Sequence, residues 1–550
     1  MQPLHFKFVP VVNDQHTAAR AYFLCVIGML LVESMIRLLP ALAHLLSRRK
    51  HAGNSTYEPH PRNHWTISVW IHKLLTLPSP IPFITDHTVA SLIRCLIFTG
   101  LNVLWGWNRI RYTTDYQLYG WLTIANAGLT LLLPTRTNLL SIVARIPSPV
   151  LLMYHRWAGT ATLVHATLHF SLTAQHYIRT EQFDTVLENA RIRVGILGWA
   201  VLAVMFLTSI RILRRRTFEL FYYTHFLFLV FVAAAFYHAA YTSEFILPGL
   251  ILWAVDRLVR FAYNFRAIKL TSVTHYSAGQ VTKLKFEGMK TTSPGQIAWL
   301  QIPGISALNW HPFTIASAPG KQKTGTIAIR SLGGYTKKVM NLAVEATAAG
   351  ADRTELAASA ASLKIRLDGP YGVGRLCYSQ FPVVVLVAGG IGITPAMSIA
   401  SHIVNVHAEA EKSSSSKYHQ HIHLLWTIKD ARHLAWFEDE LTSLASQSKG
   451  LLLLTIDIDI YITGGGLQEE NELEGGPGGI YKYQGPGPVH KGRRPNLTEW
   501  FKSIKETRPG LDAAVNLCGP RALTRAGRHA AARTSSRDGL FFVEEEEFEF

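Results

Sequence analysis

Long apolar segments constrain this chain more than any other feature of its sequence. Hydrophobic residues make up 48% of the 550 residues, and they are concentrated in the first half. About 20 consecutive apolar residues are needed for a helix to cross the hydrocarbon core of a bilayer. Seven segments meet this need, so the sequence predicts a bundle of about seven membrane helices. They cover residues 21–46, 88–107, 117–134, 149–173, 194–213, 218–241 and 245–263.

Two of these segments carry histidines at matching depths. In YHRWAGTATLVHATLHF, His155 and His169 are fourteen residues apart, and in YYTHFLFLVFVAAAFYHAAY, His225 and His238 are thirteen apart. At 1.5 Å per residue each pair spans about 20 Å of helix. Polar side chains are costly in lipid and tend to mark functional sites. Side by side, the two helices would offer one imidazole pair near each membrane face, an arrangement that suits two haems stacked across a bilayer.

The helical phase of these histidines differs between the two segments. Fourteen residues turn a helix by about 1400°, which brings His169 within about 40° of the face that carries His155. Thirteen residues leave His238 about 140° from His225, so the second segment needs a local irregularity such as a π-bulge. His165 lies about 80° from the face of His155, and we therefore interpret it as a packing residue.

Basic residues border the apolar segments. The formal net charge is +17, and much of it lies next to predicted spans, which indicates membrane topology and not a nucleic-acid partner. With these loops in the cytoplasm, the N-terminus lies outside and everything after Phe261 lies inside. His155 and His225 would then be near the cytoplasmic face, and His169 and His238 near the outer face. The sequons at Asn54 and Asn496 would be cytoplasmic and unglycosylated.

Glu33 and Arg37 lie on one face of the first predicted span, so this helix is expected to be tilted or paired against other helices. Its apolar run has no cleavage site of small residues, which favours a permanent span over a signal peptide. The chain has four cysteines. None forms a CxxC pair, so neither a disulfide framework nor a zinc site is expected.

The second half of the chain has the residue pattern of a soluble protein. Short alternating runs such as VTKLKFEG, IAWLQIP and GTIAIRSL predict an antiparallel β-barrel. Further on, FPVVVLVAGGIGITPAMSIASHIV followed by HIHLLWTIKD predicts a βαβ unit of a parallel sheet. A Gly- and Pro-rich stretch at 463–495 is predicted to be a mobile insertion. We therefore divide the chain into a transmembrane bundle (1–264, haem region about 100–241), a β-barrel domain (265–376) and an α/β domain (377–550).

A short motif after an apparent barrel strand gives the first resemblance to a known family. The segment HPFTIAS, with the motif HPFT-x-x-S, resembles the ferredoxin reductase-like flavoproteins, and within them the ferric reductase and NADPH oxidase superfamily. The resemblance implies that these side chains lie against FAD, and the motif comprises His311, Pro312, Phe313, Thr314 and Ser317. The downstream I-R-x-x-G-x-x-T pattern supplies Arg330, Gly333 and Thr336. An arginine followed by glycines suits the FAD pyrophosphate, because exposed N–H groups can approach the anion.

Nucleotide-binding motifs follow in the order that the family implies. DGPYG at 368–372 resembles the segment between the flavin and nucleotide domains, and the family's GGIG-x-T-P appears as Gly389, Gly390, Gly392, Thr394 and Pro395. Glycines at a strand-to-helix turn let dinucleotide phosphates lie at the helix N-terminus. C-G-P appears as Cys518, Gly519 and Pro520, which the resemblance places close to the nicotinamide. G-R-R-P resembles the family's G-R-P, which implies that either Arg493 or Arg494 binds the 2′-phosphate of NADPH. Of the two, Arg494 is the preferred candidate.

The chain ends in FFVEEEEFEF, which resembles the family's aromatic C-terminus beside the flavin. Phe548 is the preferred aromatic residue and Phe550 the alternative; an ordinary edge strand is the competing interpretation. In the membrane half, His155-Arg156-Trp157-x-Gly159 followed by His169 resembles the haem helix of fungal metalloreductases, although Thr160 replaces the arginine often found there.

The resemblance implies a transmembrane ferric or cupric reductase. It would use NADPH, FAD and two b-type haems ligated by His155 with His225 and by His169 with His238, and it would reduce ferric chelates or siderophores outside the cell, with Cu²⁺ as a further acceptor. The family's usual location is the plasma membrane, with the vacuolar membrane as an alternative, and an iron permease or a multicopper oxidase would be a functional partner. A superoxide-generating oxidase is the alternative within the family. A transporter or receptor with an inert flavoprotein-like tail is the alternative outside it.

Overall fold

A computed structural model describes the fold in two compact units. One unit is formed by residues 1–44 and 93–259, and the other by residues 45–92 and 260–549. The residues that the structure describes are 14–51, 64–79, 88–107, 115–136, 138–144, 146–261, 266–306, 309–320, 323–348, 364–372, 376–413, 418–464 and 483–546.

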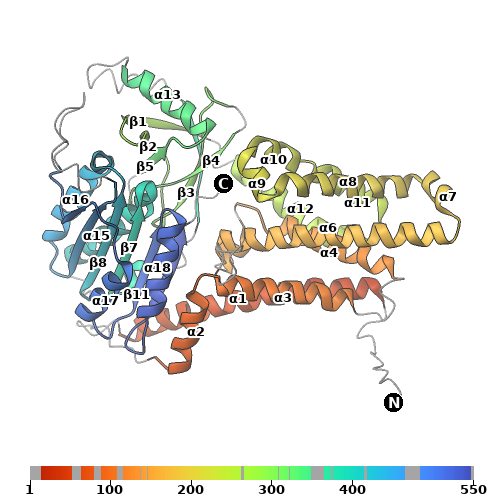
Figure 1. Ribbon diagram of the computed structural model, residues 1–550, viewed down its shortest axis with the longest axis horizontal. Helices are drawn as coiled ribbons and strands as arrows, with labels where there is room; N and C mark the ends of the chain where they lie inside the picture. Colours follow the sequence, from red (N-terminus) through yellow and green to blue (C-terminus); the bar gives the residue numbers. More distant parts are fainter. Residues whose placement is uncertain are drawn as a thin grey trace. The chain divides into compact units, whose positions relative to one another are not determined.

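The first unit is a bundle of helices (Figure 1). Among the described residues every predicted span is helical, but the helix breaks at Ile210 within the span 194–213 and after His225 within the span 218–241. The helices of this unit are α1 (Gln15–His51), α3 (Val89–Gly106), α4 (Tyr116–Leu132), α5 (Leu139–Val143), α6 (Ser148–Arg179), α7 (Phe183–Glu188), α8 (Ala190–Ser209), α9 (Arg211–Arg216), α10 (Phe218–His225), α11 (Phe228–His238) and α12 (Thr242–Val259). The last residues of α1, from Leu45, are grouped with the other unit.

Four helical stretches among the described residues are long and apolar enough to cross a membrane. They are Gln15–Ile36, Val89–Gly106, Ala190–Ser209 and Phe218–His238. The helix α4 has 17 residues, and α6 carries four histidines and two arginines among its 32 residues. The chain is therefore a membrane protein with several apolar helices, while the predicted count of seven spans and their orientation stay predictions.

The pairing expected for Glu33 is found between α1 and α3. Arg94 contacts both carboxylate oxygens of Glu33, with its Nε 3.0 Å from Oε2 and its Nη2 2.8 Å from Oε1. The Tyr154 hydroxyl also donates to Oε2 at 3.2 Å. Because a buried carboxylate is costly without partners, these contacts explain how α1 accommodates an acidic residue.

The second unit begins its globular part with an antiparallel sheet of six strands, in the order β4-β3-β6-β1-β2-β5. A bridge between Ile315 and Ile327 joins the two edge strands, which closes the sheet as the predicted barrel requires. The helix α13 (Gly334–Ala348) follows β5, and the strands are β1 (Arg266–Tyr276), β2 (Val281–Glu287), β3 (Ile297–Gln301), β4 (His311–Thr314), β5 (Thr324–Arg330) and β6 (Ile365–Tyr371).

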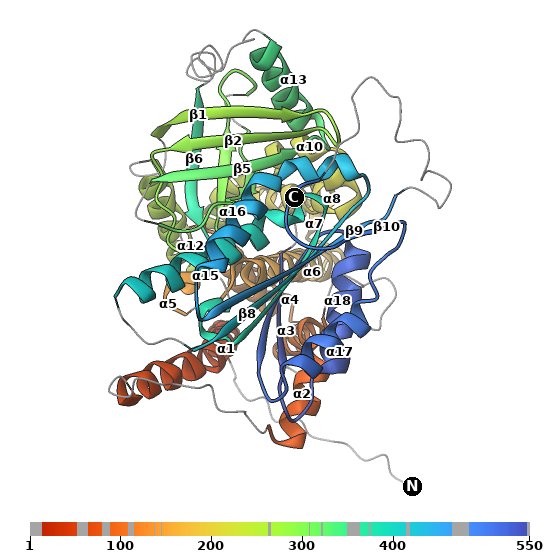
Figure 2. The same ribbon diagram turned by 90° about the vertical axis from the view of Figure 1, so that its left-hand side faces the viewer.

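A parallel sheet of six strands follows, in the order β10-β9-β8-β7-β11-β12 (Figure 2). Its strands are β7 (Val383–Gly389), β8 (Gln420–Ile428), β9 (Leu454–Ile462), β10 (Val489–Lys491), β11 (Ala513–Cys518) and β12 (Phe541–Glu546). The helices of this part are α15 (Ile393–Lys412), α16 (Glu438–Lys449), α17 (Leu497–Thr507) and α18 (Arg521–Thr534), with short 3₁₀ turns at Tyr378–Gln380, Gly390–Gly392 and Ala431–Trp436.

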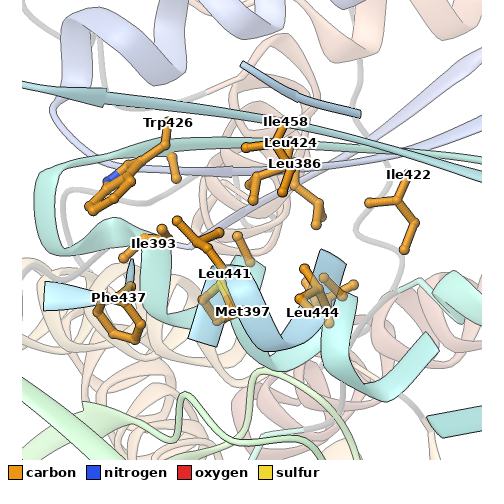
Figure 3. Close-up of a cluster of buried hydrophobic side chains, with 14 of the residues drawn as sticks. Leu386, Ile393, Met397, Ile422, Leu424, Trp426, Phe437, Leu441, Leu444 and Ile458 are labelled. Carbon is orange, nitrogen blue, oxygen red and sulfur yellow. The ribbon is translucent and has the colours of Figure 1, made fainter. Parts of the chain in front are cut away.

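Helices cover both faces of this sheet, which explains why its central strand β7 is apolar and buried throughout. One face packs Leu386 and Trp426 against Met397 of α15 and Leu441 of α16 (Figure 3). The other face packs against α17 and α18. The strand order reverses between β7 and β11, and dinucleotides bind at the carboxyl ends of strands at such a point.

One sequence-based expectation needs adjustment here. Of the predicted insertion 463–495, residues 465–482 lie outside the described residues, but Val489–Lys491 forms the edge strand β10. Pairing with β9 therefore overrides the loop-like composition at that point. Just after this stretch, the side chain of Asn496 caps α17 by accepting from the Glu499 N–H at 3.4 Å.

Candidate functional site

The four histidines of the bundle meet as two pairs, as their spacing predicted. The ring centroids of His155 and His225 are 6.1 Å apart, and those of His169 and His238 are 6.3 Å apart. Two imidazole nitrogens that each bond a metal at about 2 Å place their ring centres about 6 Å apart. Both pairs therefore fit an iron ion between the rings.

Backbone carbonyls fix the orientation of three of these rings. Nδ1–H donates to the carbonyl of Thr130 from His155 at 2.8 Å, to that of Tyr116 from His169 at 2.7 Å and to that of Arg191 from His238 at 2.7 Å. A carbonyl can only accept, so the proton is on Nδ1 and the lone pair is on Nε2. This is the tautomer that an axial ligand needs. Among the described atoms, the buried Nδ1 of His225 has no such partner.

The sequence makes each of these carbonyls available. Pro134 is four residues after Thr130 and has no N–H, so the Thr130 carbonyl has no donor from the next helical turn. Gly120 and Gly195 are four residues after Tyr116 and Arg191. A Cβ at Gly120 would lie 3.1 Å from the His169 ring, and a Cβ at Gly195 would lie 2.5 Å from the His238 ring. Small residues thus let the imidazoles approach the helix backbones, a signal that the histidine spacing did not reveal.

The predicted irregularity between His225 and His238 is present, and its form is a tight turn. The helix α10 ends at His225 and α11 begins at Phe228. In between, the Phe226 N–H bonds to Tyr223 O at 3.2 Å and the Leu227 N–H to Thr224 O at 3.0 Å. These contacts span three residues, as in a 3₁₀ helix, and not the five of a π-bulge. The turn changes the helical phase, so both histidines can face α6.

His165 is a packing residue, as predicted. Its Nε2–H donates to Oδ1 of Asn102 at 3.1 Å, and its ring stacks on Tyr119. The amide of Asn126 also donates to Oδ1 of Asn102 at 3.0 Å, and Tyr22 donates to Oδ1 of Asn126 at 2.7 Å. This buried network joins α1, α3, α4 and α6 and satisfies Nε2 of His165, while Nδ1 of that ring has no partner among the described atoms.

The first predicted flavin motif lies on β4 and the turn after it. The ring of His311 stacks on Tyr335 with centroids 4.0 Å apart. Burial lowers the pKa of His311 to about 4, so its imidazole is neutral at physiological pH. Thr314 is buried, with no partner for its Oγ1 among the described atoms, and Oγ of Ser317 accepts the Thr326 N–H at 3.2 Å. The other members of the motif, Pro312 and Phe313, are half-buried on the same strand.

The second flavin motif lies at the end of β5 and the start of α13. The Thr336 hydroxyl oxygen accepts N–H groups from Leu332 and Gly333, each at 2.9 Å. This arrangement fixes the turn before the helix. Arg330 reaches towards the nucleotide-binding motif, because a Cβ at Gly390 would lie 3.8 Å from its Nη1. The two motifs thus come together although sixty residues separate them.

The nucleotide motifs meet at the carboxyl ends of β7 and β11. Ala388 pairs in register with Cys518. A Cβ at Gly389 would lie 2.5 Å from Cδ of Pro520, and one at Gly392 would lie 2.6 Å from the Cys518 carbonyl oxygen. Gly390 has φ +56° and Gly519 has φ +150°. Thr394 and Pro395 form the buried first turn of α15. These glycines are required because a side chain would push the two turns apart.

Glu546 is a residue of this site that the sequence motifs did not indicate. It is the last residue of β12 and pairs in register with Cys518, and Nδ2 of Asn516 donates to its Oε1 at 3.3 Å. Burial, followed by the charge of Glu544, raises the pKa of Glu546 to about 8. Burial also raises the pKa of the Cys518 thiol, with Glu546 contributing. A protonated carboxyl and a neutral thiol therefore lie together, and only the register of β12 with β11 shows which glutamate of the run lies beside Cys518.

The remaining predicted site residues lie at the margin of the parallel sheet. Arg493 and Arg494 are exposed after β10, and Nη2 of Arg493 donates to Nδ1 of His490 at 2.7 Å. Phe548 and Phe550 lie outside the described residues.

The antiparallel barrel, the parallel sheet and their glycine turns define a ferredoxin reductase-like flavoprotein, which here follows a helical membrane unit in one chain. Three family models match in the same order. They are "Ferric reductase like transmembrane component" at residues 119–236, "FAD-binding domain" at 264–375 and "Ferric reductase NAD binding domain" at 381–532. The chain belongs to the ferric reductase and NADPH oxidase superfamily, and it carries FAD- and NAD(P)H-binding domains after a transmembrane region in which family members bind haem.

Similar proteins come from both branches of this superfamily. Ferric reduction oxidase 8, mitochondrial, from Arabidopsis thaliana is 28% identical over 60% of this chain and 45% of its own length. NADPH oxidase 3 from Homo sapiens is 26% identical over 68% of this chain and 72% of its own. The heavy chain of a superoxide-generating NADPH oxidase from Dictyostelium discoideum is 27% identical over 74% of this chain and 85% of its own. The chain thus spans less than half the length of this plant relative, and a fungal origin is not shown.

Among solved structures, a ferredoxin NADP⁺ reductase from Neisseria gonorrhoeae matches 51% of this chain and 98% of its own length. The sequence identity is 15% and the TM-score is 0.31.

Proposed function

We propose that this protein is a transmembrane ferric-chelate reductase that passes electrons from cytosolic NADPH to Fe³⁺ outside the membrane. The observation that carries the proposal is the pairing of His155 with His225 and of His169 with His238, each pair fitted to an iron between the rings. Bound FAD would accept a hydride and release electrons singly, and two bound haems would carry them one at a time.

His155 with His225 and His169 with His238 would hold the irons of the two haems, which would supply one-electron transfer. The hydrogen bonds to backbone carbonyls would orient Nε2 of His155, His169 and His238 and raise the basicity of these imidazoles, whereas Nδ1 of His225 has no such bond among the described atoms. The chain would thus supply two sites at different depths of one bundle.

In the soluble unit, the side chains would bind and orient the two nucleotides. Arg330 and the N–H groups at the N-terminus of α13 would hold the FAD pyrophosphate, and the turn that contains Gly390 and Gly392 would hold the NADPH phosphates at the N-terminus of α15. Cys518 would lie against the nicotinamide, with Glu546 beside it as a proton-carrying group. Arg494 would bind the 2′-phosphate that distinguishes NADPH from NADH.

The acceptor is proposed to be a ferric chelate or siderophore, with Cu²⁺ as a further substrate, and the membrane to be the plasma membrane. The test uses intact cells that express the protein. A ferric chelate that cannot cross the membrane should be reduced at the expense of internal NADPH, and membranes should show a reduced-minus-oxidised haem spectrum. An absent haem spectrum would refute the proposal.

Superoxide production is the second candidate function. It is favoured by one observation, that the two relatives named as NADPH oxidases match over 72% and 85% of their own length. Dye reduction that superoxide dismutase abolishes, with little direct reduction of a ferric chelate, would select the oxidase. Resistance of ferric reduction to the dismutase would select the reductase.

A further inference from the structure

The helix α2 (Thr66–Thr76) carries two opposite faces, and only one of them is packed against protein. At 100° per residue, Val69, His72 and Thr76 fall on one side of the helix, and Ile67, Trp70 and Ile71 fall on the other. The first side contacts the nucleotide-binding domain. The second side faces solvent in the structure, although it is apolar.

The packed side of α2 contacts the edge strand β12 of the parallel sheet. Nε2–H of His72 donates to the Phe541 carbonyl at 2.9 Å, and its ring lies edge-on to Phe542. Just before the helix, Nε2 of His64 pairs with Oδ1 of Asp512 at 2.8 Å. Asp512 is buried and its Oδ1 also accepts the Leu540 N–H. These contacts join α2 to the start of β12, more than 400 residues away in the sequence.

The opposite side is an apolar surface that consists of Ile67, Trp70 and Ile71, with Trp65 at the start of the helix. The exposed fractions are 71% for Ile67, 64% for Trp70, 44% for Ile71 and 82% for Trp65. Single exposed apolar residues are ordinary, but four within seven positions on an eleven-residue helix mark an interaction surface.

The position of α2 in the chain indicates what covers this surface. Candidate membrane spans lie on both sides of it, at Gln15–Ile36 and Val89–Gly106. The helix has no acidic residue, and it carries Lys73. A hollow at its start is lined by His64, Trp65, Thr66, Ile67 and Arg537. Tryptophans concentrate at membrane interfaces, and basic groups are attracted to anionic headgroups.

We propose that α2 lies in the interface of the membrane that its neighbouring spans cross, with Ile67, Trp70 and Ile71 among the lipid headgroups and upper acyl chains. Its other face holds β12 and the nucleotide-binding domain at the bilayer surface. A short amphipathic helix binds a membrane in this way when its apolar face is buried at the headgroup boundary. The strand that α2 holds at Phe541 carries Glu546 at its other end.

The test measures the depth of α2 in a bilayer and needs neither haem nor an acceptor, so its outcome is independent of the proposed function. Full-length holoprotein is placed in vesicles of phosphatidylcholine and phosphatidylserine. Single cysteines are introduced as Ile67→Cys or Trp70→Cys in a background with Cys25→Ser, Cys95→Ser and Cys377→Ser, in which buried Cys518 is the one native cysteine left, and are labelled with an environment-sensitive fluorophore. Leu452→Cys is the matched control, because Leu452 is an apolar residue of the same unit that is 88% exposed.

Lipids that carry a quencher in the upper acyl chain should reduce the fluorescence at positions 67 and 70 by about twofold or more, and should leave position 452 unchanged. Adding Trp70→Glu to the Ile67→Cys variant should abolish this quenching. Equal quenching at 67, 70 and 452 would overturn the proposal. Shielding of 67 and 70 from aqueous iodide without quenching by lipid would also overturn it, because the surface would then be covered by protein, either another part of this chain or a second copy.

Discussion

Arg260 donates a hydrogen bond from its Nε to Oδ2 of Asp368 at 2.7 Å, and both side chains are buried. Arg260 is the first residue after α12, and Asp368 belongs to the DGPYG segment at the end of β6. Tyr371 of the same segment donates to the other carboxylate oxygen. One carboxylate therefore joins the chain that leaves the bundle to the segment between the two nucleotide domains.

Arg260→Met should destabilise the flavin domain by about 3 kcal/mol, because it leaves a buried carboxylate without its charged partner. Arg260→Lys should recover only part of the loss, since an ammonium cannot reproduce the planar contact. Thermal release of FAD, followed by its fluorescence, measures the effect. Unchanged release temperatures in both variants would show that the contact is not stabilising.

His169→Ala or His238→Ala should remove one of two haems and abolish reduction of an external chelate. Reduction of a soluble dye by the flavin domain should continue, because the nucleotide sites are in the other unit. The measurements are the haem content per protein and the two reductase activities. His165→Gln is the control, and it should keep both haems because His165 is bonded to Asn102.

Gly195→Ala should impair haem binding by the pair His169 and His238 through a steric clash alone. The new methyl group would lie 2.5 Å from the His238 ring, so the ring must leave the Arg191 carbonyl. Loss of such an orienting bond typically weakens metal binding by about 10- to 100-fold. Haem retention during purification measures this effect, and Gly28→Ala, which would add a methyl group with no neighbour within 4 Å, is the matched control. Equal retention in the two variants would contradict the role given to Gly195.

Glu546 should make both activity and stability depend on pH. Its pKa in the folded protein is raised to about 8, so its proton-carrying form is lost above that pH, and NADPH oxidation should fall. In the unfolded chain the carboxyl ionises near pH 4.3. Between these values the folded state binds more protons than the unfolded state, so stability should decrease as pH rises, by up to about 1.4 kcal/mol per unit.

Glu546→Gln should remove this contribution from both profiles. The pH dependence of NADPH oxidation by the flavin domain and the pH dependence of thermal unfolding are the two measurements. If the variant keeps both the wild-type fall in activity near pH 8 and the wild-type decline in stability between about pH 4.3 and pH 8, the titrating group is a different one.

Lys283 links the barrel to the nucleotide-binding domain. Its Nζ contacts both carboxylate oxygens of Glu440 at 2.9 and 3.1 Å and lies 4.5 Å from the ring centre of Phe437. Lys283→Met should reduce stability by about 1–3 kcal/mol, less than a fully buried pair because Glu440 is partly exposed. Lys285→Met, at an exposed position two residues further along the same strand, should change it by less than about 0.5 kcal/mol. A similar denaturation midpoint for both variants would refute the link.

Sequence periodicity and motif order were sufficient to predict the helical bundle, the two types of sheet and the histidine pairs. Spacing alone even located the irregularity between His225 and His238, because a regular helix could not place both on one face. It could not predict the form of that irregularity, which depends on local hydrogen bonds. The chemistry-bearing motifs were predictable since glycines and prolines leave strong local signals.

Contacts between segments that are far apart in the sequence could not be predicted, for a physical reason. The pairing of His64 with Asp512 joins residues whose local sequences say nothing of each other. Glu546 was hidden in a run of four glutamates, where only the register of β12 with β11 decides which carboxylate is buried. The Thr130 and Arg191 carbonyls become acceptors for histidine only when α4, α6, α8 and α11 pack.

The turn at Phe226 and Leu227 separates α10 from α11, so each helix can rotate about its own axis independently of the other. A substitution that twists α10 shifts His225 against His155, while α11 keeps its own packing on α8 and leaves His238 in register with His169. Evolution can therefore tune the iron environment at one depth of the bundle without retuning the other, which a single continuous helix would not permit.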